Sequence, residues 1–122
     1  MGKEAVLSQI RGNKAADMPV GCRICVRAPG EIVATITGDI DHHRAAELRA
    51  YLDEIILQKR PSSLFLDLSG IDFMDSSGLG LIMGRYTLLG RLGGQLILEH
   101  PSAAAKRMIA LAAMERFIRI VY

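Results

Sequence analysis

The segment Leu64-Phe65-Leu66-Asp67-Leu68 decides the fold class, because it is short and almost entirely apolar. A strand of this composition is typical of a sheet that helices bury on both faces. Segments with helical spacing of apolar residues flank it on both sides. The preceding stripe comprises Ala45, Leu48, Leu52, Ile55 and Ile56, and the following one comprises Leu79, Ile82, Met83 and Tyr86. The sequence therefore predicts a helix, a buried strand and a second helix in succession.

The rest of the chain extends this alternation. The first helix is expected to begin after Asp41 and to end near Lys59-Arg60, before Pro61. Further strands are predicted over 22–27, 31–37, 95–99 and 117–121. A turn is expected at 28–30, a break in the second strand at 38–41 and a loop over 69–75. A third helix is expected to begin at Pro101-Ser102. The order β-β-α-β-α-β-α-β predicts an α/β fold: a mixed, mostly parallel sheet of about five strands with three or more helices and an antiparallel first strand.

Composition limits the classes of function. A chain of 122 residues is one domain's worth, and 50% hydrophobic against 23% charged residues argues against extensive disorder. A net charge of +2 gives no basic field for nucleic acid. Neither a transmembrane run nor a signal-peptide pattern is apparent, so we expect a cytoplasmic protein. We expect residues 1–18 to form an arm or a short leading helix, and residues 19–122 to form the domain.

Cys22 and Cys25 form a C-x-x-C motif. This spacing suits a metal or a redox disulfide in a helix or a knuckle. Here the surrounding residues indicate a strand, in which positions three apart point to opposite faces. We therefore interpret the cysteines as two small buried or half-buried side chains in a reducing cytosol.

The residues most informative about function are 72–80, Asp-Phe-Met-Asp-Ser-Ser-Gly-Leu-Gly. A dinucleotide fingerprint does not fit, because Gly78, Gly80 and Gly84 are spaced one residue too far apart. A Walker-type phosphate loop would need a Lys that is absent. A hydrolase nucleophile elbow would need Gly two residues before and after Ser, which neither Ser76 nor Ser77 has.

Ser76 lies at or beside the start of the second predicted helix. A Ser in this position is usually a capping residue. The same position suits a phosphate, since first-turn N–H groups and the helix dipole favour an anion. Gly78 is expected to leave the backbone open to another protein. Asp75 is interpreted either as a cation ligand or as a further helix-terminus charge.

The sequence of residues 73–86, FMDSSGLGLIMGRY, strongly resembles the signature of the anti-anti-sigma factors. These are single STAS domains, and the similarity is greatest to the sporulation type that antagonises the anti-sigma F kinase. Residues 38–43, the pair Gly93-Gly94 and residues 101–107 also match the family. The resemblance covers residues 20 to 121. In place of the Ser-Gly-Leu turn of many relatives stands Ala112-Ala113-Met114, so the third helix is expected to run longer or to end differently.

The resemblance implies a phosphorylation-switched binding protein, with no enzymatic activity, cofactor or metal. Ser76 is the implied phosphoacceptor of a GHKL-type serine kinase that is also the anti-sigma factor. The unphosphorylated form would bind this nucleotide-loaded kinase and release the sigma factor, and a PP2C-type phosphatase would restore it. No direct contact with nucleic acid or membrane is implied. The implied partner-binding residues are Asp39, Asp41, His42, Asp75, Ser77, Gly78 and Leu81.

Leu81 and Leu88 lie off the apolar stripe of the second predicted helix. They are either exposed contacts for the partner or packed under the third helix.

Two other functions stay open at this point. One is a STAS scaffold or ligand-binding module that acts in a signalling complex without phosphorylation. The other is an enzyme with Ser76 as nucleophile and His42 or His43 as base, although adjacent histidines at a helix start are more often solvated. Metal binding by Asp41, His42 and His43 is disfavoured, because neighbouring side chains diverge on a helix.

Overall fold

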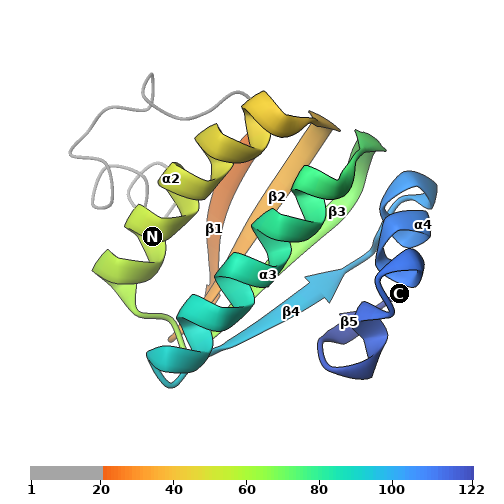
Figure 1. Cartoon of the computed structure of the whole chain (residues 1–122). Helices are drawn as coiled ribbons and strands as arrows, with labels where there is room; N and C mark the ends of the chain where they lie inside the picture. The colour runs from red at the N-terminus through yellow and green to blue at the C-terminus, as the bar shows by residue number, and fades with distance from the viewer. Residues whose placement is uncertain (1–20) are drawn as a thin grey trace.

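In residues 21–122, the part of the chain that the computed structural model describes, five strands form one sheet in the order β1-β2-β3-β4-β5 (Figure 1). β1 is antiparallel to β2, and the other neighbouring strands are parallel. The elements are β1 Cys22–Ala28, β2 Glu31–Ile40, α2 His42–Lys59, β3 Ser63–Met74, α3 Ser76–Arg91, β4 Gln95–Glu99, α4 Ala103–Leu111, the 3₁₀ turn η2 Met114–Arg116 and β5 Arg119–Val121. The predicted order of elements is confirmed, whereas the expected arm over 1–18 lies outside the described residues.

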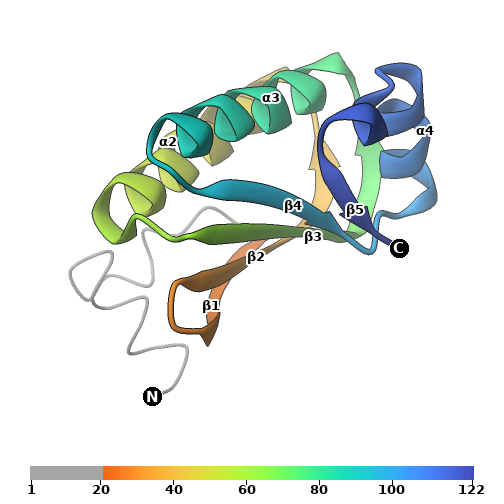
Figure 2. The same cartoon turned by 90° about the horizontal axis from the view of Figure 1, so that it is seen from below.

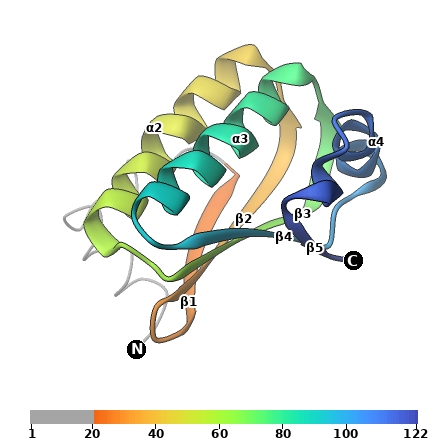
Figure 3. The same ribbon diagram turned by 60° about the horizontal axis from the view of Figure 1, so that its bottom comes forward.

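The α-helices of the described part cover one face of the sheet. α2 and α3 lie side by side over it, and α4 lies near the end of β3 (Figures 2 and 3). Leu64, Leu66 and Leu68 of β3 point into the core that these helices close. Phe65 and Asp67 point to the opposite face and are half-buried. Within residues 21–122, helices thus cover one face of this strand, and none of them covers the other face.

Side chains of the sheet itself are buried on the face that carries no helix of residues 21–122. Val33 and Ile97 are 8% and 2% exposed, although both lie outside the helix-side core. The Arg27 guanidinium lies 4.5 Å from the centre of the Phe65 ring and donates two hydrogen bonds to Glu99. An arginine stacked in this way covers apolar surface with its stem while its charge stays paired.

The third strand is longer than predicted. Strand β3 continues through residues 69–74, the segment expected to be a loop, and β2 likewise continues through Gly38 to Ile40. Opposite β2, β3 carries two register shifts, each with one extra residue on β3. These bulges let Leu68, Ile71 and Met74 all face the core at a spacing of three residues. Period-two alternation, the signal for a strand, is therefore lost there.

The helix faces agree with prediction for α2 and differ for α3. All five predicted stripe residues of α2 are buried, and Arg60 ends the helix with a φ of 44°. In α3 the buried residues are Gly78, Leu81, Ile82, Arg85 and Leu89. Of the predicted stripe Ile82 alone is fully buried, and the rest are half-buried. Leu81 is 5% exposed and Leu88 is half-buried against the core, so the interpretation of both as exposed contacts is wrong.

The end of the chain differs in detail from prediction. Helix α4 ends at Leu111, and Ala113 has a φ of 52° before the 3₁₀ turn. The backbone N–H groups of Phe117 and Ile118 donate to the Met114 carbonyl at 3.1 and 2.9 Å and continue the turn, so β5 begins at Arg119 rather than at Phe117. The backbone thus makes the turn that glycine usually makes in this region of conformational space, but with an alanine.

The structure confirms that the two cysteines are buried or half-buried. Cys22 lies in the helix-side core, Cys25 is half-buried on the opposite face, and both are free thiols. Burial raises the pKa of the Cys22 thiol to about 12, which keeps it in the unreactive protonated form at neutral pH. Among residues 21–122, no helix combines the length and apolar character needed to span a membrane.

Candidate functional site

Two helix N-termini lie together at one edge of the sheet. The adjacent parallel strands β2 and β3 end with Ile40 in register with Met74. Helix α2 begins two residues after Ile40, and α3 begins two residues after Met74. The backbone N–H of Asp75 donates to the Ile40 carbonyl at 3.1 Å and joins the two connections. The carboxyl edge of parallel strands is where α/β folds place their binding sites.

Aspartates cap both helices. The Asp41 carboxylate accepts a hydrogen bond from the Arg44 N–H at 2.8 Å, and the Asp75 carboxylate accepts one from the Ser77 N–H at 2.8 Å. The expectation of an aspartate cap before the first helix is confirmed. The usual reading of Ser76 as a capping residue is wrong, because Asp75 is the N-cap and Ser76 is the first residue of α3.

Ser76 does not cap the helix. Its side chain is exposed, and no hydrogen bond from its hydroxyl is found within residues 21–122. The neighbouring Ser77 is half-buried, and its N–H is committed to the cap. The positive ends of α2 and α3 both lie at this edge, an arrangement that favours a negative group on the exposed hydroxyl. The two adjacent serines therefore differ in what they offer to a partner.

The connection from β2 to α2 is held by Arg44. Its Nη1 donates to the Asp39 carbonyl at 2.7 Å, and its guanidinium lies against Gly38, whose φ is 92°. Beside it is a shallow cavity of about 540 Å³ that Asp39, Asp41 and Asp72 help to line. Acidic side chains from both strand ends thus reach the same hollow.

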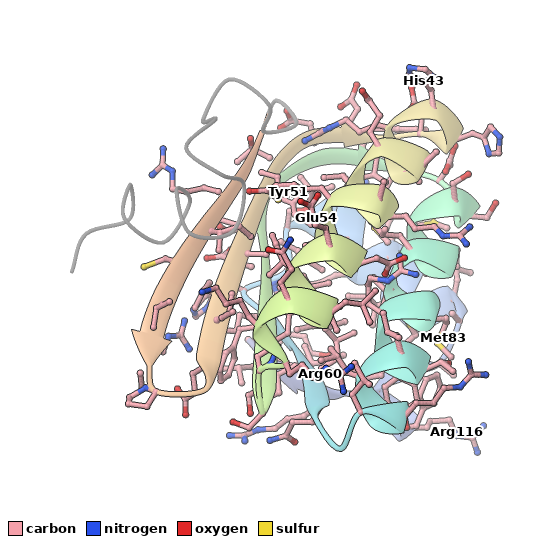
Figure 4. The ribbon with its side chains drawn as sticks, turned by 90° about the vertical axis from the view of Figure 1, so that its left-hand side faces the viewer. His43, Tyr51, Glu54, Arg60, Met83 and Arg116 are labelled. Atoms are coloured by element: carbon pink, nitrogen blue, oxygen red, sulfur yellow. The ribbon has the colours of Figure 1, made fainter. Side chains whose placement is uncertain are left out.

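The structure brings together most of the predicted site. Asp39, Asp41 and His42 lie on the connection from β2 to α2, and Asp75, Ser76 and Ser77 lie on the connection from β3 to α3. All are exposed except Asp75 and Ser77, which are half-buried. The neighbouring His43 lies in the first turn of α2 and helps to line the same hollow as Asp39 and Asp41 (Figure 4).

Gly78 and Leu81 do not belong to this exposed set. Gly78 is buried, and a Cβ atom there would lie 2.6 Å from the Met74 side chain. The expectation that Gly78 leaves the backbone open to another protein is therefore wrong, since this glycine lets α3 pack closely on the end of β3. Leu81 faces the core, as described above.

Sequence reasoning missed three residues of this site. Phe73 is 51% exposed beside the first turn of α3, Asp72 is exposed next to it, and Arg44 holds the facing connection. The segment containing Asp72 and Phe73 was expected to be a loop, in which no alternation indicates the direction of a side chain. Arg44 lies off the apolar stripe of the first helix, and no local pattern indicates that its side chain reaches back to the end of β2.

The described residues show no group of three His, Cys, Asp or Glu side chains placed to hold a metal ion. Within the same residues no hydrogen bond joins Ser76 or Ser77 to a histidine. What the site presents is the exposed hydroxyl of Ser76, a hollow lined in part by Asp39, Asp41 and Asp72, and the exposed aromatic ring of Phe73. These features suit recognition by another protein and modification of the hydroxyl.

The fold and this site are those of a known domain family. The STAS domain model matches residues 24–122, and the chain belongs to the STAS domain family. One relative is the anti-sigma F factor antagonist of Paenibacillus polymyxa, 31% identical over 91 residues that span 75% of this chain and 78% of the relative.

Two solved structures are also similar, and both are of the anti-sigma factor antagonist SpoIIAA at 25% identity. The unphosphorylated form has a TM-score of 0.72, with 83% of this chain and 88% of that chain covered. The phosphorylated form, from Bacillus, has a TM-score of 0.66, with 83% and 91% covered. The predicted resemblance to the anti-anti-sigma factors is thereby confirmed.

Proposed function

We propose that this chain is an anti-anti-sigma factor: its unphosphorylated form binds an anti-sigma factor that is also a serine kinase, and phosphorylation of Ser76 ends that binding. The observation that carries the proposal is the Ser76 hydroxyl, exposed at the first residue of α3, while Asp75 performs the capping. The relatives named as anti-sigma factor antagonists, one of them solved in both phosphorylation states, support it.

The chemistry of the switch follows from the charges around Ser76. A phosphate adds about −1.5 to −2 charges at neutral pH. The N-terminus of α3 tolerates this charge, and the Asp75 carboxylate opposes it, so the two effects partly cancel within the domain. A kinase must place its nucleotide phosphates close to Ser76 in order to transfer one. After transfer, the two anionic groups repel each other in an interface that excludes water.

The partner surface is formed by the exposed and half-buried residues around Ser76. Asp39, Asp41 and His42 approach it from one connection, and Asp75 and Ser77 flank it on the other. The partner is a GHKL-type kinase with its nucleotide bound, and a PP2C-type phosphatase regenerates the active form. This is a regulatory role in which the chain is the substrate of the kinase and not itself a catalyst.

The test uses the GHKL-type kinase of the same genome together with ATP. The intact mass of the parent should rise by one phosphate, and peptide mapping should place it on Ser76. Ser76→Ala should take up no phosphate and should still bind the kinase. Ser77→Ala is the matched control and should be phosphorylated like the parent. Label on Ser77 or Ser69, or an unchanged mass after binding, would contradict the proposal, and the latter would favour a STAS scaffold without phosphorylation.

A further inference from the structure

A groove of about 410 Å³ separates the outer surfaces of α2 and α3, which lie side by side (Figure 4). Small residues line it: Ala45 and Ala46 on α2, and Gly80 and Gly84 on α3. A Cβ atom added at Gly80 or Gly84 would meet nothing within 4 Å. No neighbour within the domain therefore requires glycine at these positions, although glycine inside a helix is less stable than alanine. The two glycines keep the groove open.

A buried arginine lines the same groove. Arg85 is 6% exposed, and its Nε lies 2.9 Å from a carboxylate oxygen of Asp53. Its Nη1 is buried and has no hydrogen-bond acceptor among residues 21–122. The other oxygen of Asp53 lies 3.9 Å from Nε of Arg49, a largely exposed residue that also lines the groove. Two guanidinium groups thus share one carboxylate, and the groove has an excess of positive charge.

The unpaired donor of Arg85 and the excess of positive charge indicate what kind of group would bind in the groove. A buried guanidinium with an unused donor is costly unless an acceptor is supplied. A carboxylate is the natural acceptor, because it matches the planar donors of arginine. The groove also reaches Ser77, next to the exposed hydroxyl of Ser76. A protein bound at Ser76 would therefore extend along the groove.

We propose that the groove between α2 and α3 receives a helix of the anti-sigma factor kinase, and that an Asp or Glu of this helix pairs with Arg49 and Arg85. The inference rests on the proposed function, and it adds a second contact region that is separate from the phosphoacceptor. Small residues on one helix allow the backbone of a second helix to approach closely, and the charged pair then fixes its position along the groove.

The first test fills the groove without disturbing the core. Gly84→Ala and Gly80→Ala should raise the midpoint of thermal unfolding by roughly 3–6 °C each, because alanine favours the helix. Both should weaken binding of the nucleotide-loaded kinase, by about fivefold or more when combined. Gly90→Ala is the matched control: it lies in α3 outside the groove, and its added Cβ also meets nothing within 4 Å. It should raise the midpoint without affecting binding.

The second test reverses the charge. Arg49→Glu should weaken kinase binding by at least about tenfold, whereas Arg91→Glu, an exposed arginine of α3 outside the groove, should leave it within twofold. A Glu→Arg or Asp→Arg change on one helix of the kinase should restore binding to Arg49→Glu.

The possible outcomes separate the two proposals. If the parent is phosphorylated on Ser76 but the groove variants bind the kinase like the parent, the groove inference is wrong and the proposed function stands. If the groove variants alter self-association in ultracentrifugation and leave kinase binding unchanged, the occupant is a second copy and the inference is again wrong. If the parent does not bind the kinase at all, the proposed function fails first.

Discussion

Arg27 of β1 and Glu99 of β4 form a two-fold hydrogen-bonded ion pair, although β2 and β3 lie between their strands. The Nη1 and Nη2 atoms of Arg27 lie 2.9 and 2.7 Å from the two carboxylate oxygens of Glu99. The guanidinium of Arg27 also lies over the Phe65 ring of β3, between the two strands. The Arg27 side chain therefore links the antiparallel edge of the sheet to its parallel part, on the face opposite to α2 and α3.

This pair should make stability depend on pH in the acid range. The hydrogen bonds from Arg27 hold the pKa of Glu99 below its ordinary value of 4.5. The carboxylate therefore stabilises the fold above about pH 4.5, and this contribution is lost as the pH falls through the lower pKa of the folded state. Glu99→Gln should lower the free energy of unfolding at pH 7 by about 1–3 kcal/mol, a range that allows for the partial exposure of Arg27.

Denaturant titrations at pH 7 and at pH 3 measure this effect. The gap between parent and Glu99→Gln should be smaller at pH 3. Glu115→Gln, which makes the same change of charge at an exposed residue, serves as the control and should stay within about 0.5 kcal/mol of the parent. A gap for Glu99→Gln that does not change with pH would show that the ion pair is not its cause.

Ala113 offers a prediction of increased stability. Its φ of 52° lies in the left-handed region, which an alanine occupies at a cost and a glycine occupies freely. Ala113→Gly should therefore raise the free energy of unfolding by about 0.5–1 kcal/mol. Its neighbour Ala112 has a φ of −89°, and Ala112→Gly should lower stability instead. Thermal unfolding of the two variants should thus shift in opposite directions, and a fall for Ala113→Gly would contradict the argument.

Phe73 should contribute to partner binding rather than to folding. Phe73 is 51% exposed, and it precedes Ser76, the proposed phosphoacceptor, by three residues. An exposed aromatic ring near the residue that the kinase must reach is a favourable anchor for a partner. Phe73→Ala should weaken kinase binding by at least about tenfold and change the free energy of unfolding by less than about 1 kcal/mol. Phe117→Ala, at a ring 45% exposed in a distant part of the fold, is the control. A comparable loss of binding in both variants would count against a specific contact.

A negative charge on Ser76 should leave the fold intact. Because Ser76 is exposed at the positive end of α3, Ser76→Asp should keep the circular dichroism of the parent and change the midpoint of thermal unfolding by only a few degrees. Calorimetry and circular dichroism together measure this. Unfolding of the variant would show that the phosphate acts by disrupting the domain and not at the interface.

The order of strands and helices was predictable because the apolar spacing of the core elements is regular. Prediction from apolar spacing failed in two places: the bulged part of β3, and the face of α3 that buries an arginine. The bulges in β3 interrupt alternation after Leu68, so six residues of strand were expected to be a loop. In α3, a charged residue occupies the core-facing stripe, since Asp53 of the neighbouring helix partners Arg85. That pairing joins residues 32 positions apart in the sequence, so no local pattern predicts it.

The candidate site was predictable to the extent that it depends on a local motif. Ser76 and the aspartates around it lie where the resemblance and the helix start placed them. The burial of Gly78 and Leu81 depends on how α3 packs on Met74 and on the core, which the motif alone does not reveal. The exposure of Phe73 likewise depends on the bulged end of β3, and so it was found only in three dimensions.

The most direct test of the central claim is the affinity of the nucleotide-loaded kinase for the chain with and without one phosphate on Ser76. Calorimetric titration should show that the phosphorylated form binds at least about 30-fold more weakly, while its thermal unfolding stays close to that of the parent. The unphosphorylated form should displace the sigma factor from the kinase, and the phosphorylated form should not. Equal affinities for the two forms would contradict the account.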